Sequence, residues 1–429
     1  MLRDTPPPRR LSTSSAAPSL AHGAPDEQPA RDADVVGMAR ARARLQWMRL
    51  PLQPVLGLLA AALIVRLALL PLAEGNDFLA YDKLATLSLH GRDVYALELS
   101  HHLGTLAWSY LPLLLHLFTS IQWLAAHTGW PFRVLGKLPT VAADLAVGAL
   151  LYRALRRHGR PERIALIGMA LYLFNPLVLF NGALCGRFDA IALAFLMLAL
   201  EGYRTRLFAP AFALAVSAKT FPLFLLPPLA LGHDRQSPRR LALACALLPV
   251  LALPYIITDP HGLLAIFVYH RTNLGRLSWY DILNTSPMYV ASEQALRVAR
   301  IGALLYPPLV FLLVRGSRYV KTAQCLALYL VLNQVVYEQY LLWPLPFLII
   351  VGLRDKTAPG RLALWLVLLS TVAGMLENEF TWEHPASPLH YHPAPTPWVP
   401  LNVALNVSAL AFVVVAERRA RVESRKVVA

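Results

Sequence analysis

The sequence predicts an all-α, polytopic integral membrane protein with about twelve transmembrane helices. Of its 429 residues, 56% are hydrophobic and only 15% are charged, whereas soluble domains carry roughly 25% charged residues. The mean hydropathy is +0.48, and the apolar residues fall in long blocks along most of the chain. This composition excludes a disordered or fibrous protein and disfavours a soluble enzyme.

Each spanning helix needs roughly 20 apolar residues. Two shorter segments flank Lys219, and we expect them to be half-helices that meet at a bend, which protein or a water-filled cavity must surround at membrane depth. The predicted spans are 52–73, 133–154, 164–182, 185–203, 207–218, 220–232, 240–257, 295–315, 321–338, 340–353, 361–377 and 400–416.

The charge distribution predicts the orientation. We interpret the apolar stretch 106–126 as an external helix resting on the membrane, because most of the 40 Lys and Arg residues then lie on the cytoplasmic side, as the positive-inside rule requires. Basic loops also explain the net charge of +15 without nucleic acid. The three largest loops, 74–132, 258–294 and 378–399, are then external, so we expect the chemistry there.

Four regions follow from this organisation. Residues 1–50 are rich in Pro, Arg, Ser and Ala and predict a disordered cytoplasmic tail. Residues 51–257 form a first module that contains the first spans and the loop 74–132. Residues 258–417 form a second, C-terminal transmembrane module, and residues 418–429 form a cytoplasmic tail.

The first external loop opens with acidic residues. Asp77 comes just after the first span, where a carboxylate can take a proton from a substrate hydroxyl as a general base. If a helix continues from Asp77, Tyr81 and Asp82 lie near the same face, which makes Asp82 the reserve candidate. The alternative is that Asn76 or Asp77 only caps a surface helix.

Basic residues suit a phosphate group. A lysine in a setting as apolar as that of Lys219 is costly and is usually functional or paired, although it can also snorkel to the headgroups. His270 and Arg271, ahead of Trp279 and Tyr280, suit an anionic lipid head or a sugar; membrane anchoring is the alternative reading of the two aromatic residues.

Other polar residues permit more than one role. Arg187 and Asp189 share a tight turn, where a salt bridge and a substrate contact both remain open. Asp144 lies within a predicted span, and we expect it to pair with a buried polar neighbour. Glu338 and Tyr340 form a last cluster between two predicted spans.

Neither the cysteines nor the histidines predict a metal site or a cofactor. Cys185, Cys245 and Cys325 lie far apart in apolar segments and give no disulfide framework. The spacing of the histidines in the third external loop matches no standard zinc pattern; they are His384, His390 and His392.

Seven fragments, in this order, resemble motifs of the GT-C superfamily of polyprenyl-phosphate-sugar glycosyltransferases over most of residues 52–355. The pattern is most similar to GPI mannosyltransferase I and to bacterial GT-C mannosyltransferases. Val94 and Glu338 stand where those patterns have proline, and Asn76 stands where mannosyltransferase I has a second acid. The fragments are Asn76-Asp77-Phe78 with Tyr81, Gly91 to Tyr95, Tyr110 to Leu113, Gly136-Lys137-Leu138 with Asp144, Asn175-Pro176-Leu177 with Gly186 to Asp189, Lys219 to Pro222, and Glu338 to Trp343.

The resemblance implies an inverting hexosyltransferase that moves a sugar, with mannose as the best choice, from a polyprenyl-phosphate donor. Asp77 would deprotonate the acceptor hydroxyl, and Lys219, His270 and Arg271 would stabilise the leaving phosphate. No cofactor is implied. The remaining residues would bind substrate, namely Tyr81, Tyr110, Arg187, Asp189, Glu338 and Tyr340.

The implied partners are the lipid-linked sugar donor, a lipid, glycan or protein acceptor, the lipid bilayer and, in addition, a small membrane subunit. The implied location is the cell membrane with an extracytoplasmic active site, or the endoplasmic reticulum membrane in a eukaryote.

Two other classes compete with this interpretation. A secondary transporter suits twelve spans and a broken helix, but the sequence shows no internal repeat of the kind such folds usually contain. A transferase of the O-antigen-ligase type, using a lipid diphosphate donor, would place its chemistry in a late loop and leave the Asp77 motif unexplained.

Cysteine labelling tests the predicted orientation. We expect His116→Cys and His127→Cys to react with an impermeant maleimide added outside intact cells, and His158→Cys to be protected. Protection of the first two positions together with labelling of the third would contradict the orientation.

Overall fold

The computed structural model describes residues 52–99, 108–230, 237–266, 275, 277–280, 292–354, 356–380 and 398–428. Every regular element within these ranges is a helix, in agreement with the predicted fold class. The predicted tail 1–50, His270, Arg271 and the histidines of the third external loop lie outside the described residues.

Short and long helices alternate along the chain. In the first part they are α2 (Leu52–Leu69), α3 (Asn76–Leu89), α4 (Val94–Leu99), α5 (Pro112–Thr128), α6 (Phe132–Leu135), α7 (Leu138–Arg157), α8 (Glu162–Leu173), α9 (Pro176–Leu179), the π-helix η1 (Phe180–Leu184), α10 (Asp189–Glu201), α11 (Phe208–Ala218), the 3₁₀-helix η2 (Phe221–Leu225) and α12 (Leu226–Ala230). In the second part they are α13 (Ser237–Thr258), α14 (Pro260–Ala265), α16 (Ser292–Leu313), α17 (Arg318–Leu332), the 3₁₀-helix η4 (Glu338–Leu342), α18 (Leu345–Arg354), α19 (Ala358–Phe380) and α20 (Trp398–Val428).

The number of helices able to cross a membrane is smaller than expected. Five helices of the described residues are long and apolar enough to cross a membrane by themselves. A sixth span is counted if Glu162–Leu173 and Pro176–Leu184, which are bent by 47° relative to each other, act as one. About twelve spans are therefore not confirmed in the described part of the chain, because segments such as α10 (13 residues) and α18 (10 residues) are short. The five helices long and apolar enough by themselves are Phe132–Arg157, Pro238–Thr258, Gln294–Leu313, Ala358–Glu377 and Val399–Arg425.

Polar residues and proline mark the breaks. Asn175 caps α9 by accepting a hydrogen bond from the Leu177 amide, and Pro176 follows at a position where its missing N–H costs nothing. The expected bend at Lys219 is confirmed: Lys219 is extended, with φ −157° and ψ 138°, and it separates α11 from η2 and α12.

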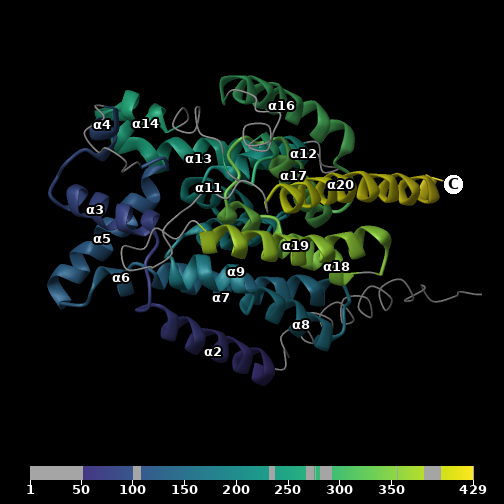
Figure 1. Cartoon of the computed structure of the whole chain (residues 1–429), viewed down its shortest axis with the longest axis horizontal. Coiled ribbons are helices and arrows are strands. Elements are labelled where there is room, and N and C mark those ends of the chain that lie inside the picture. Colours follow the sequence, from purple (N-terminus) through teal and green to yellow (C-terminus); the bar gives the residue numbers. More distant parts are fainter. Residues whose placement is uncertain are drawn as a thin grey trace, which may run out of the picture. The chain divides into compact units, whose positions relative to one another are not determined.

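Two groups of helices pack against each other. Helix α7 packs on α8 and α10, and α10 packs on α11, while α18, α19 and α20 pack one on the next. Helix α18 lies against α7 and α8 (Figure 1), and α19 reaches α9. Residues from distant parts of the sequence therefore meet between the two groups.

A buried ion pair joins α2 to α7. Arg66 Nε lies 3.2 Å from Asp144 Oδ2, and both side chains are almost fully inaccessible. The Tyr172 hydroxyl donates to Asp144 Oδ1 at 3.1 Å. The prediction that Asp144 pairs with a buried polar neighbour is confirmed.

The segment interpreted as an external helix is helical from Pro112 to Thr128. Proline opens it, and Gly129 closes it in the left-handed conformation with φ 73°. The helix packs against α3 and also contacts α6, α11 and α13. Its place relative to the membrane stays a prediction.

Candidate active site

Most of the predicted site residues gather where helix ends converge. Asp77 lies in the first turn of α3, and Arg187 lies in the turn between η1 and α10. Lys219 follows α11, and Glu338 begins η4. Helix ends leave backbone groups and side chains available that helix interiors do not, so these four positions can form one polar site.

Arg187 is the centre of the site. Its Nε lies 3.3 Å from Asp77 Oδ2, and its Nη1 donates to Glu338 Oε1. The exposed fractions of the side chains differ sharply: 43% for Asp77, 17% for Arg187 and 4% for Glu338. One guanidinium thus links an accessible carboxylate to a buried one.

Asn181 also binds the Arg187 guanidinium. Its Oδ1 accepts from Arg187 Nη1 at 2.8 Å, and its Nδ2 donates to the Leu177 carbonyl at 3.0 Å. Asn181 is fully buried and belongs to the π-helix η1. Short π-helical turns are rare and frequently lie at functional sites.

A second ion pair lies next to the first. Lys219 Nζ and Trp343 Nε1 both lie 2.6 Å from Asp189 Oδ1. The exposed fractions of the Lys219 and Asp189 side chains are 7% and 2%. Of the two alternatives for Lys219, a paired lysine rather than a snorkelling one is observed.

Aromatic rings enclose this second pair. The Lys219 ammonium lies 5.5–5.6 Å from four ring centroids, those of Tyr110, Phe188, Tyr340 and Trp343. Such distances permit cation–π attraction. Phe188 also contacts Tyr81, with 5.0 Å between the ring centroids. We call these four rings and Tyr81 the aromatic wall; it connects the Lys219 pair to the residues beside Asp77.

The first turn of α3 is fixed by close packing. Phe78 is fully buried, and a Cβ atom added at Gly136 or Gly186 would overlap its ring. Gly186 also has φ +78°, a conformation that other residues rarely adopt. Phe78 therefore wedges between two glycines and sets the position of its neighbour Asp77.

The capping interpretation of this helix start is wrong. The N-cap position of α3 is occupied by Gly75, so neither Asn76 nor Asp77 is the N-cap residue. The carboxylate of Asp77 instead faces Arg187.

Asp82 lies in a different environment. Burial raises its pKa above the usual value, Glu74 raises it further, and a hydrogen bond from Gln122 works in the opposite direction. Asp82 therefore takes up a proton more readily than an ordinary aspartate, but its neighbours are not those of the Arg187 site.

Eight of the predicted site residues meet within this assembly of two ion pairs and an aromatic wall: Asp77, Tyr81, Tyr110, Arg187, Asp189, Lys219, Glu338 and Tyr340. Three residues that contact them were not predicted to be site residues: Asn181, Phe188 and Trp343. Phe188 and Trp343 lie inside quoted motifs, whereas nothing in the sequence singles out Asn181. Within the described ranges, no group of three His, Cys, Asp or Glu residues could hold a metal ion.

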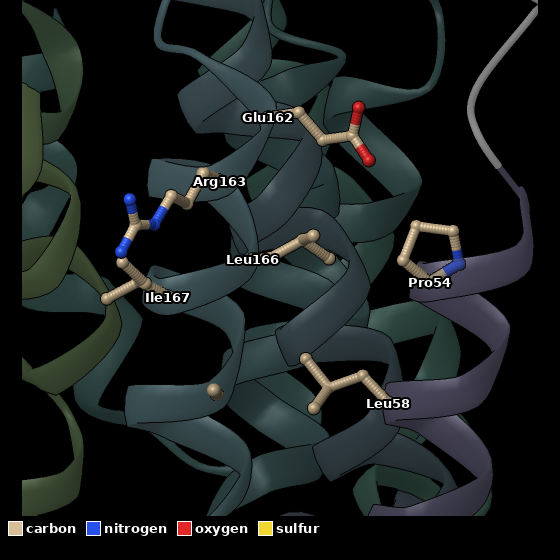
Figure 2. Close-up of a pocket in the computed structure, with 7 residues that line it drawn as sticks. Pro54, Leu58, Glu162, Arg163, Leu166 and Ile167 are labelled. Atoms are coloured by element: carbon tan, nitrogen blue, oxygen red, sulfur yellow. The ribbon is translucent and has the colours of Figure 1, made fainter.

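A groove elsewhere on the molecule shares no residue with this site. It has a volume of about 590 Å³. Figure 2 shows the charged side chains of Glu162 and Arg163 on α8 above apolar side chains of both α2 and α8. Pro54 and Leu58 line it from α2. Its lining is mainly apolar.

No family profile matches the chain. A segment of 161 residues, 37% of the chain, is 28% identical to GPI mannosyltransferase 1 of Gibberella zeae. The aligned part covers 34% of that protein, so the chain spans about a third of the relative's length. The similarity supports a distant, mannosyltransferase-like relationship.

The buried Lys219–Asp189 pair predicts a stability effect. Lys219→Met should lower the free energy of unfolding by about 3–5 kcal/mol, because it leaves a buried carboxylate without its counter-charge. Adding Asp189→Asn should restore most of this loss, since asparagine can still accept from Trp343. Thermal unfolding in detergent, followed by tryptophan fluorescence, measures both; a Lys219→Met protein as stable as the parent would contradict the pairing.

Proposed function

We propose that this protein is a membrane glycosyltransferase that moves a hexose, mannose, from a polyprenyl-phosphate donor to an acceptor hydroxyl with inversion. The observation that carries the proposal is the accessible Asp77 carboxylate, held by the largely buried Arg187 at the edge of an aromatic wall. The seven ordered motifs and the similarity to a GPI mannosyltransferase support it further.

Asp77 is the proposed general base. Of the three acids in the site, it alone is accessible enough to meet a substrate, since Asp189 and Glu338 are both buried. The acceptor hydroxyl passes its proton to Asp77 as its oxygen forms a bond to the anomeric carbon. The bond from that carbon to the phosphate oxygen breaks, and polyprenyl monophosphate leaves with the electron pair.

Arg187 and Glu338 are proposed to hold this base in place. A carboxylate fixed by a charge-assisted contact keeps one orientation, which a base on a freely rotating side chain would lack. Glu338, in turn, restrains the guanidinium through Nη1. Both residues then act on the acceptor side of the reaction, as substrate-binding and orienting groups.

The donor phosphate needs further cations. Arg187 and Lys219 are already paired with carboxylates, so Lys219 can meet a phosphate oxygen only if it shares or exchanges Asp189. His270 and Arg271 are therefore the proposed main ligands of the phosphate, with Lys219 contributing from within its aromatic surroundings. We place the reaction on the extracytoplasmic side, where a lipid-linked sugar can deliver a donor.

A donor panel tests the proposed function. Purified protein is incubated with polyprenyl-phosphate mannose, glucose and other hexoses, and release of polyprenyl phosphate is scored. We expect release with at least one donor, mannose first, when an acceptor extract is present. Release only from a lipid diphosphate donor would favour the ligase-type transferase, and uptake of solute into vesicles without any release would favour the transporter.

Substitution of the base tests the mechanism. Asp77→Asn keeps the shape of the side chain but removes the proton acceptor, so we expect turnover to fall by about 10²–10⁴-fold with expression unchanged. Asp82→Asn is the matched control on the same helix and should retain activity. A fully active Asp77→Asn enzyme beside an inactive Asp82→Asn enzyme would move the base to Asp82.

A further inference from the structure

We propose that Lys137 is a positioning residue that fixes Asp77 relative to Arg187 by clamping the two chain segments that carry them. Its effect on catalysis rests on the proposed function, whereas its effect on geometry does not. Lys137 lies at the start of α7, where it precedes the first helical residue, and it has no place in the proton or phosphate chemistry described above.

The ammonium of Lys137 is bound entirely by the backbone. Nζ donates to the carbonyl oxygens of Leu70 at 2.9 Å, Ala73 at 2.5 Å and Leu184 at 2.8 Å. A lysine ammonium has three donors, so these three carbonyls use all of them. The side chain is fully buried, and Lys137 forms no ion pair within the described ranges.

The three carbonyls belong to two segments that lead into the site. Leu70 and Ala73 lie in the connection between α2 and α3, a few residues before Asp77. Leu184 ends η1, three residues before Arg187. The Lys137 side chain therefore joins the segment that leads to Asp77 to the segment that leads to Arg187.

Two further contacts converge on the same point. The Gly75 amide donates to the Cys185 carbonyl at 3.1 Å, directly joining the two segments. The Lys137 ammonium also lies 5.5 Å from the centroid of the Phe78 ring, the ring that wedges α3 in place. Loss of the ammonium would leave three carbonyls without this donor. The Gly75–Cys185 hydrogen bond, the Asp77–Arg187 pair and the packing of Phe78 on Gly186 would then have to hold the segments without it.

A cross-linking experiment measures the clamp without any activity. The backbone of Gly75 is extended, and a Cβ atom added there would lie 3.1 Å from both Cys185 Cβ and the Cys185 carbonyl oxygen. A small separation of the two segments would bring the Cβ atoms to the roughly 3.5–4.5 Å of disulfides. Gly75→Cys should therefore form a disulfide with the native Cys185 under a mild oxidant. Cys245→Ser removes the exposed thiol from the background.

The rate of this cross-link is compared with and without Lys137→Met, which has a similar length but no donor. We expect slower and incomplete cross-linking with Lys137→Met. The control is Arg133→Met, which removes a neighbouring exposed cation that only approaches Glu74, at 4.0 Å, and it should leave the rate unchanged. Equal rates in the Lys137→Met and parent proteins would overturn the proposal. If Lys137→Met does not fold, Lys137→Gln takes its place with the same expected outcome.

Sugar transfer supplies the second readout. A displacement of the base by about 1 Å can cost up to about 10²-fold in rate, so Lys137→Met should lower kcat by about 10–100-fold while KM for the donor stays the same. In the Gly75→Cys background, oxidation should restore most of the lost turnover, and reduction should remove it again. An unchanged kcat, or a loss that the disulfide does not rescue, would refute the positioning role.

The two proposals fail separately. If no polyprenyl-phosphate sugar is used by the parent protein, the proposed function is wrong, but the cross-linking rates still decide whether Lys137 clamps the segments. If the parent protein transfers sugar and Lys137→Met cross-links and turns over normally, only the clamp is wrong.

Discussion

The site depends on the charge of Arg187. A guanidinium with only 17% of its side chain exposed must be compensated by nearby acceptors, because a buried charge without partners is strongly destabilising. Its partners come from three distant parts of the chain: Asp77 on α3, Asn181 on η1 and Glu338 on η4. Meeting this single requirement brings α3, η1 and η4 to one place.

The charges around Arg187 are graded by exposure. Glu338 and Asp189 are buried and pair with Arg187 and Lys219, respectively. Of these three acids, Asp77 alone remains open to solvent. This gradient separates groups that stabilise the arrangement from the group that can meet a substrate. It also means that both cations of the described site, Arg187 and Lys219, are already neutralised, which is why His270 and Arg271 are proposed as ligands of the donor phosphate.

Helix breaks create the site. The bend at Asn175, the π-helix η1 and the extended Lys219 each interrupt a helix that would otherwise bury its backbone groups. Interrupted helices are tolerated in a membrane only where side chains or cavities satisfy the freed groups, and Lys137 and Asn181 do this here. The same interruptions explain why the described helices able to span a membrane fall short of the expected count: apolar composition reveals the segments but not where they break.

The apolar composition and the long apolar blocks determined the helical class of this protein, because an apolar segment of about 20 residues can cross a membrane as a helix that satisfies its own backbone hydrogen bonds. Short motifs also singled out polar residues that the structure brings together: Asp77, Arg187, Asp189, Lys219 and Glu338. Their pairing could not be obtained in this way. Tertiary structure alone decided that Arg187 contacts Asp77 and Glu338 while Asp189 contacts Lys219, and that Asn181 and Lys137 support them. The physical reason is that a sequence states which groups must find partners, whereas the packing of helix ends fixes which partners lie within hydrogen-bonding distance.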